Sequence, residues 1–338
     1  MHLAIYLPLA APLVAAAGAR SIASRLPPQA ATWLLTAAAV ALAALSTAVL
    51  GLIACTALLR IPLVATLGHM SLQVARRNDP ASVSAAVGAA ALLAVATAAA
   101  CRAAWRRVRA LVSAARQGRC LPGSGQVVVV PDGGADAYAV PGWPGRIVVT
   151  AGMLDALEPA ERQVLLAHEH AHARSHHYLF TALTYLAAAA NPLLRPVAEA
   201  VTYTVERWAD ETAARHCGDR RLAARAIGKA ALASADRSVP GRGAVALGIA
   251  GPPGTRAKRL GAWARRGWAT GLRQVFGRGD AGPVPRRVAA LLAPPPRLRP
   301  LLVAAVAAVV LISSVAALDA ARELHAVVEQ AQVFTGRS

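Results

Sequence analysis

Residues 164–174 read VLLAHEHAHAR, and positions 168 to 172 carry the pattern His-Glu-x-x-His. On a helix, His168 and His172 share one face and stand about 6 Å apart along the axis, so both imidazoles can bind one metal ion. Glu169 is turned by about 100° around the helix, which suits a general base beside the metal better than a third ligand. The stretch therefore predicts a helix that holds zinc and activates a water molecule.

A catalytic zinc ion normally has three protein ligands, so one ligand must come from elsewhere in the chain. Glu206 and Asp210 stand four residues apart after Asn191-Pro192 and share a helix face. Glu206 can complete the zinc site, while Asp210 can accept a hydrogen bond from the distal N–H of a ligating histidine. The alternative is a solvated acidic face paired with nearby arginines, and the upstream motif favours the metal site.

The composition indicates a membrane protein, because 56% of the 338 residues are hydrophobic and the mean hydropathy is +0.44. Four apolar runs predict four spans, at residues 3–19, 31–59, 81–101 and 301–318. A signal peptide is the alternative for the first run, but no basic region precedes it and a second run follows at once. The four cysteines form no C-x-x-C pair, which argues against a disulfide framework or a zinc ribbon.

Arginines near the ends of the spans predict the orientation of the chain, because cytoplasmic loops carry the excess of positive charge. The groups on the predicted cytoplasmic side are Arg20 and Arg25; Arg102, Arg106, Arg107 and Arg109; and Arg286, Arg287, Arg297 and Arg299. We therefore expect a multi-pass protein of the plasma (inner) membrane with both termini outside. Residues 1–101 would hold three spans, 102–299 a cytoplasmic metallopeptidase domain, and 300–338 the fourth span and a short tail.

The net charge of +19 is concentrated in residues 219–299, where fifteen Arg, two Lys and three Asp give a net charge of +14. This Arg-rich segment has few aromatic residues and no recognisable nucleic-acid module, and it leads directly into an apolar run. Attraction to anionic lipid headgroups explains the charge more economically than nucleic acid, which we do not expect as a direct partner. Within it, residues 241–254 read as a loop, and 256–260 and 286–292 as short amphipathic helices.

The predicted cytoplasmic region begins with two short β-branched runs, at residues 126–130 and 146–150. Glu158-Pro159 then opens the helix that bears the motif. The apolar run 178–190 is too short to span a membrane comfortably and is expected to pack over the site. The fold class is thus an α-helical membrane protein with about four transmembrane helices and a mainly α (α+β) cytoplasmic domain, and the family resemblance given next implies that this domain is a zincin-like metallopeptidase.

The order His168-Glu169-x-x-His172, Asn191-Pro192 and Glu206-x-x-Ala209-Asp210 resembles the integral-membrane gluzincin metallopeptidases. The resemblance is to the antirepressor type of the β-lactam-sensing Bla and Mec regulators (peptidase family M56), and the HtpX-type membrane proteases (M48) are close relatives. Residues 136–139 and 147–152 also resemble the strands before the active-site helix in both groups. The resemblance implies zinc ligation by His168, His172 and Glu206, with one zinc ion per chain. It also implies that Glu169 is the general base and Asp210 a partner of a ligand.

Several neighbouring residues depart from this family pattern or stay unassigned. His170 stands where an apolar residue is usual and should face away from the metal, whereas His176 should lie on the ligand face one turn beyond His172. His177 is expected to have a structural role. The donor that stabilises the oxyanion is left open between Tyr138, Arg207 and His216.

The function that these residues predict is a zinc endopeptidase that cleaves a protein or peptide at the cytoplasmic face of the lipid bilayer. By resemblance, the substrate would be a winged-helix transcriptional repressor. The alternative with the same chemistry is quality control of membrane proteins, as in HtpX-type enzymes, and a non-catalytic membrane scaffold is the alternative of a different class. Only about twenty residues follow the fourth span, where the β-lactam sensors carry a penicillin-binding domain. Direct antibiotic sensing is therefore not expected.

Overall fold

The computed structural model describes residues 6–58, 83–121, 125–142, 145–235 and 283–335. Within these residues, four helices are long and apolar enough to cross a membrane, which confirms the predicted number of spans. They are α1 (Leu7–Arg25), α2 (Pro28–Leu58), α5 (Val83–Arg119) and α13 (Pro300–Thr335). The protein is mostly helical and has one small sheet.

Two of these helices extend well beyond the apolar runs that predicted them. Helix α5 continues from Cys101 through the cluster of arginines to Arg119, and α13 continues from Leu318 to Thr335. Neither extension contains a proline or a glycine before its last two residues, so nothing in the sequence interrupts the helical backbone there. The predicted loop 241–254 and the predicted helix 256–260 lie outside the described residues.

The sheet has three strands, one more than the β-branched runs alone predicted. They are β1 (Val127–Val130), β2 (Ala137–Val140) and β3 (Arg146–Thr150), in the order β1-β3-β2. Strand β3 pairs in parallel with β1 and antiparallel with β2. Strand β2, which the family resemblance alone suggested, is an edge strand and packs beside α7 (Pro159–Arg174).

Six further helices build the rest of the described chain around α7. They are α6 (Ala151–Asp155), α8 (His177–Ala190), the short 3₁₀ helix η2 (Pro192–Leu194), α9 (Arg195–Cys217), α10 (Arg220–Ala235) and α12 (Pro283–Leu292). Helix α7 begins as predicted, because Pro159 occupies its first turn and Glu158 forms a capping box with Glu161. Helix α9 ends at Gly218, which takes the left-handed conformation with φ 71°.

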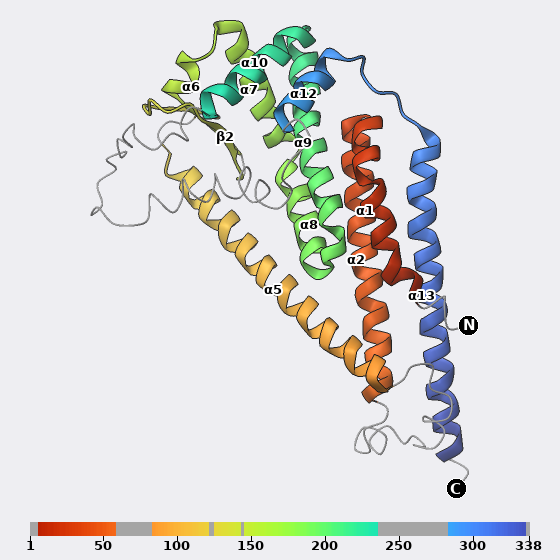
Figure 1. Cartoon of the computed structure of the whole chain (residues 1–338). Coiled ribbons are helices and arrows are strands. Elements are labelled where there is room, and N and C mark those ends of the chain that lie inside the picture. The colour runs from red at the N-terminus through yellow and green to blue at the C-terminus, as the bar shows by residue number, and fades with distance from the viewer. Residues whose placement is uncertain (1–5, 59–82, 122–124, 143–144, 236–282, 336–338) are drawn as a thin grey trace.

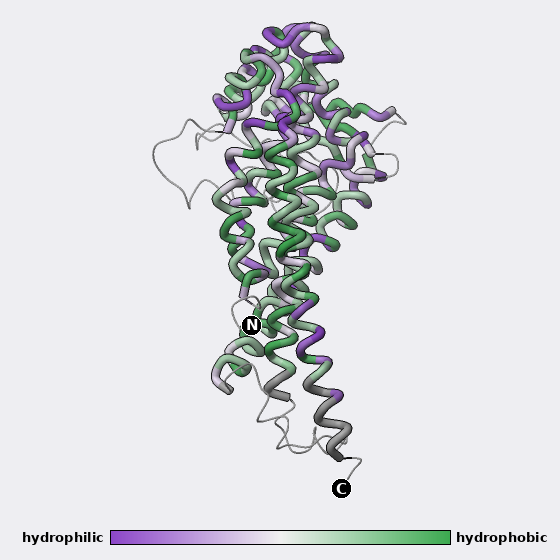
Figure 2. The backbone as a smooth tube through the Cα atoms, turned by 90° about the vertical axis from the view of Figure 1, so that its right-hand side faces the viewer, coloured by the Kyte–Doolittle hydropathy of each residue, from purple (hydrophilic) through white to green (hydrophobic). Residues whose placement is uncertain are grey.

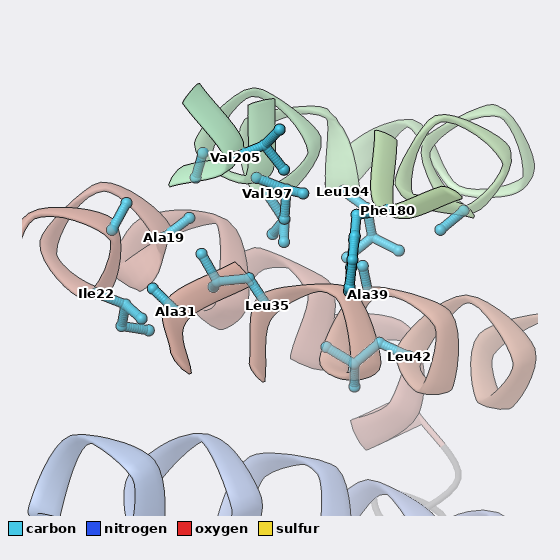
Figure 3. Close-up of a cluster of buried hydrophobic side chains, with 14 of the residues drawn as sticks. Ala19, Ile22, Ala31, Leu35, Ala39, Leu42, Phe180, Leu194, Val197 and Val205 are labelled. Carbon is cyan, nitrogen blue, oxygen red and sulfur yellow. The ribbon is translucent and has the colours of Figure 1, made fainter. Parts of the chain in front are cut away.

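Helices α8 and α9 pack directly against the membrane helices α1 and α2. Figure 3 shows the apolar cluster between them, in which Leu35 of α2 lies toward Val197 of α9 and Ala39 of α2 lies beside Phe180 of α8. Buried polar contacts cross the same boundary. The Thr32 hydroxyl donates to Thr204 at 2.9 Å, Arg207 donates to the Ala23 carbonyl at 3.0 Å, and Asn191 donates to Ser46 at 3.1 Å. The helix that carries Glu206 and Asp210 is therefore anchored on the membrane helices.

The sheet and helices α6, α7, α10 and α12 lie together at one end of the long helices (Figure 1). Helices α1 and α5 end toward that side, and α2 and α13 begin there. Hydrophilic residues concentrate in this part, whereas the long helices are coloured mainly hydrophobic (Figure 2). The three groups of arginines that were predicted to share one side of the membrane thus lie toward the end with the predicted metallopeptidase residues.

Glu161 joins α7 to α10, so its substitution should cause a measurable loss of stability. Its buried carboxylate accepts from the Glu158 amide at 3.0 Å and pairs with Lys229 at 2.8 Å and Arg225 at 3.5 Å. Glu161→Gln should lower the free energy of unfolding by about 1–3 kcal/mol, because it removes charge-assisted hydrogen bonds. Thermal unfolding of both proteins in detergent at neutral pH measures the difference.

The same carboxylate predicts how this difference depends on pH. Burial alone raises the pKa of Glu161, but the hydrogen bonds from Lys229 and Glu158 and the nearby positive charges hold it below the ordinary 4.5. The stabilisation is therefore present above pH 4.5 and is lost as the pH falls through the lowered pKa. Glu329→Gln, in an exposed pair with His325 on α13, is the matched control and should change stability little. Equal stability of Glu161→Gln and wild type at neutral pH would contradict the assignment.

Candidate metal centre

Helices α7 and α9 bring His168, His172 and Glu206 together. The two Nε2 atoms lie 3.0 Å apart, and the Glu206 carboxylate lies 3.7 Å from Nε2 of His168 and 3.5 Å from Nε2 of His172. One ligand atom from each residue lies within 4.8 Å of the other two, so the three could hold one metal ion. Two imidazoles and a carboxylate are a donor set that suits zinc and leaves room for a water molecule.

The ring atoms that face away from this cluster also have partners. Nδ1 of His168 lies 3.0 Å from Oδ1 of Asp210, the residue predicted for such a contact. Nδ1 of His172 lies 2.9 Å from Nδ1 of His177, the first residue of α8. Each histidine thus points Nε2 toward the shared centre and Nδ1 toward a different outer residue.

Arg287 of α12 connects the two carboxylates of α9. Its guanidinium donates to both oxygens of Asp210, at 2.7 and 2.6 Å, and lies 2.9 Å from Oε2 of Glu206. Burial alone would lower the pKa of the Arg287 guanidinium, but the carboxylates of Asp210 and Glu206 raise it. Arg287 therefore stays charged. The pKa of Asp210 shifts the other way: its burial would raise it, but Arg287 and His168 lower it well below its ordinary value.

The contacts of Arg287 with Glu206 and Asp210 were not predicted from the sequence, in which Arg287 indicates only the membrane orientation and a short amphipathic helix. The available signal was indirect: two acidic residues on a helix expected to be buried need a cation, and many arginines follow them in the sequence. The pattern could not show which arginine supplies the charge.

Glu169 is buried beside the three predicted ligands, with 8% of its surface exposed. Burial raises the pKa of its carboxyl group to about 7, and the negative charges of Glu206 and Asp136 act in the same direction. His168 and a backbone hydrogen bond from Ala139 oppose this rise. A carboxyl group with this pKa can both accept and release a proton near neutral pH, as a general base and acid must.

The two predicted histidine ligands differ in electrostatic environment. Burial lowers the pKa of both imidazoles, but contacts with Asp210 and Glu206 raise the pKa of His168 above its ordinary value of 6.5. The pKa of His172 lies well below 6.5, because burial, His168 and Arg287 all disfavour its charged form. His172 is thus held neutral, which is the form of histidine that binds metal.

His170 and His176 are not among the residues whose ligand atoms converge in the metal cluster. His170 contacts the Leu166 carbonyl of its own helix at 2.7 Å through Nδ1. The expectation for His176 was wrong: α7 ends at Arg174, and His176 takes a left-handed conformation with φ 47° before α8 begins. The helix face that carries the predicted ligands therefore does not continue to His176.

Two of the three residues considered for oxyanion stabilisation point elsewhere. Arg207 donates to Ala23 of α1, and exposed His216 lies ten residues beyond Glu206, which is about 15 Å along the helix. Tyr138 is 40% exposed on β2. Of these three, Tyr138 alone stays open as a donor.

A cavity of about 160 Å³ opens beside the cluster. Its polar wall is formed by Asp136, His168, Glu169 and Arg287, and its apolar wall includes Met153, Val164, and Ala226, Ile227 and Ala230 of α10. The predicted general base thus lines a space that also has apolar lining residues. Such a space can hold a chain segment with an aliphatic side chain.

Residues 100–191 match the model of peptidase family M48. The match covers a little over a quarter of the chain, from α5 to the end of α8, and includes His168, Glu169 and His172 but not Glu206, Asp210 or Arg287. No curated protein and no solved structure matches the chain.

The matching family is the one that the sequence analysis named as a close relative, not the antirepressor type that it placed first. The match supports a metallopeptidase of the M48 family, and the four apolar helices support its association with a membrane. The antirepressor resemblance is not supported in the same way.

The contacts of Arg287 predict that it contributes more to the stability of the protein than the adjacent Arg286 on α12. Arg287→Met would leave the buried Asp210 carboxylate and the half-buried Glu206 carboxylate without their cation, so the metal-free protein should lose about 3–5 kcal/mol of stability. Arg286 stacks over the Tyr203 ring at 4.6 Å, and Arg286→Met should lose about 0.5–1 kcal/mol. Thermal unfolding of the chelator-treated variants in detergent measures both, and equal losses would contradict this ranking.

Proposed function

We propose that the chain is a membrane-bound zinc metalloendopeptidase. The observation that carries this proposal is the convergence of His168, His172 and Glu206 on one centre, with Glu169 buried beside them. The fit to zinc rests on the donor types, on their distances, and on the outer partners of both imidazoles. In this proposal His168, His172 and Glu206 are the ligands, Glu169 is the general base, and Asp210 orients His168.

A zinc ion held there would polarise a peptide carbonyl and lower the pKa of a water molecule. Glu169 would accept a proton from the attacking water and return it to the leaving amine, and its pKa of about 7 suits both transfers near neutral pH. Arg287 holds one oxygen of Glu206 and both oxygens of Asp210, so these carboxylates keep their orientation during the reaction.

The substrate class follows from the elements beside Glu169. Strand β2 pairs with β3 on one side only, as far as the described residues show, and its Ala139 amide is within hydrogen-bonding reach of Glu169. An extended peptide that pairs with the outer edge of β2 would therefore pass the general base. The adjoining cavity, with its wall of small aliphatic residues from α10, would receive a side chain next to the bond that is cleaved.

We place the site at the cytoplasmic face of the plasma membrane. The support is the excess of arginine where α1 ends, in the C-terminal half of α5, and before α13. A reporter that works only in the cytoplasm should be active when inserted between α9 and α10 at Gly218 and inactive when fused after Ser338. Activity of the C-terminal fusion in intact cells would contradict the proposed orientation.

Two roles are compatible with this chemistry. The match to family M48 favours quality control of membrane proteins, as in the HtpX-type enzymes, in which damaged or misassembled membrane proteins are cleaved. Cleavage of a winged-helix repressor is the second candidate, and it rests on the order of motifs and on the layout of the spans. Contact of the Arg-rich segment with anionic lipid stays a separate prediction, because residues 236–282 lie outside the described part of the chain.

Glu169→Ala separates catalysis from metal binding. The variant should retain one zinc ion per chain and lose peptide-bond hydrolysis, because it loses the proton acceptor and keeps the proposed ligands. Zinc content is measured on purified protein in detergent, and cleavage is followed with an unstructured protein substrate. Comparison of membrane and soluble proteomes from cells with wild type or Glu169→Ala then identifies the substrates.

The controls define what each outcome means. His168→Ala should lose both zinc and cleavage, and it is matched by His216→Ala, which changes an exposed histidine away from the site and should change neither. Mapped cleavage sites should show an aliphatic residue beside the scissile bond. An unchanged rate of peptide-bond hydrolysis in Glu169→Ala would contradict the mechanism. Wild-type protein without stoichiometric zinc would favour the non-catalytic scaffold.

A further inference from the structure

The two predicted histidine ligands use the same ring atoms for the same purposes. In both, Nε2 faces the shared centre and Nδ1 faces outward. A neutral imidazole has one N–H group, so a ring that binds metal through Nε2 must carry its proton on Nδ1. Both outward nitrogens are therefore donors when metal is bound, and each needs an acceptor.

The acceptors of the two ligands are of different kinds. His168 faces the carboxylate of Asp210 at 3.0 Å, whereas His172 faces a second imidazole, that of His177, at 2.9 Å. When Nδ1 of His172 donates, Nδ1 of His177 must accept. The proton of His177 then sits on Nε2.

Nε2 of His177 is buried and has no hydrogen-bond partner among the described residues. His177 has 0% of its surface exposed, and its ring packs against Trp208 with 4.6 Å between ring centroids. An unpaired buried donor destabilises the fold, because it has lost its hydrogen bond to water and gained none in the protein. A phenyl ring would fill the same space without this loss, so packing alone does not account for an imidazole here.

The backbone before His177 is also arranged to bring it to His172. In a continuous helix, a residue five positions after His172 would be turned about 140° away from it. Helix α7 instead ends at Arg174, and the left-handed conformation of His176 redirects the chain into α8. A non-glycine residue in this conformation is disfavoured, and the turn places the two Nδ1 atoms within hydrogen-bonding distance.

We propose that His177 is a positioning residue that accepts the Nδ1 proton of His172 and so directs Nε2 of His172 toward the metal. This inference rests on the proposed zinc site and adds to it a residue outside the ligand set. The acceptor for His172 is a neutral imidazole, whereas the acceptor for His168 is a carboxylate. The hydrogen bond that orients His172 is therefore the weaker of the two. Loss of the acceptor should therefore act through the metal rather than through the stability of the fold.

The test measures zinc binding by the full chain in detergent, using competition with a chromogenic chelator. His177→Phe fills the space without an acceptor and should weaken zinc binding on the order of 10- to 100-fold. His177→Asn supplies an oxygen acceptor near the position of Nδ1 and should recover most of this loss. His216→Phe replaces an exposed histidine of α9 and serves as the matched control, with unchanged zinc binding.

A second measurement distinguishes positioning from a purely structural role. Thermal unfolding of the metal-free proteins should show His177→Phe to be at least as stable as wild type, because the unpaired Nε2–H is gone. A structural role predicts the opposite pattern, a less stable metal-free protein with unchanged zinc affinity. If His177→Phe does not fold, His177→Leu takes its place in the same comparison with His177→Asn.

The outcomes separate this inference from the proposed function. Wild-type protein that binds zinc, together with equal binding by His177→Phe, overturns the inference and leaves the peptidase proposal intact. Binding by His177→Asn that is as weak as that of His177→Phe also overturns it, because the acceptor then has no effect. Wild-type protein that binds no zinc overturns the proposed function, and the inference with it.

Discussion

The buried carboxylate of Asp210 and the half-buried carboxylate of Glu206 share the guanidinium of Arg287 where α9 meets α12, and the rest of the site depends on this attraction. Arg287 contacts both carboxylates and, with His168, holds the pKa of the buried Asp210 carboxyl group well below its ordinary value. Because Arg287 comes from α12, the candidate site is complete only when α12 has docked on α9. The carboxylates in turn face His168 and His172. The charges that join α9 to α12 therefore help to fix how the side chains of α9 meet those of α7.

The site is also tied to the membrane part of the protein. Helix α9 carries Glu206 and Asp210 and, along the same helix, the buried contacts of Thr204 and Arg207 with α2 and α1. The apolar cluster of Figure 3 joins these helices over several turns. The position of the proposed third ligand is therefore set by the membrane helices, whereas the two histidines stand on α7, which packs on the sheet and on α10. The candidate zinc site lies between a membrane-anchored helix and a helix of the hydrophilic part.

Much of this arrangement could be predicted because the signals are local. The spacing of His168 and His172 defines one helix face, and that of Glu206 and Asp210 defines another, through helix periodicity alone. The apolar runs are long enough to identify four membrane helices. Arg287 and His177 were assigned no part in the site, for different reasons. Arg287 lies 77 residues from Asp210 in the sequence, and His177 approaches His172 only because α7 ends two residues before the left-handed His176.

The sequence by itself determined the chemical groups of the candidate site and the helices that carry them, since both follow from short-range spacing and from the length of apolar runs. The tertiary structure decided which groups face one another. It joined α7 to α9, selected Arg287 from many arginines, and gave His172 an imidazole as its outer partner. These pairings depend on helix packing and on the burial of charge between segments far apart in the chain, and no local pattern encodes either of them.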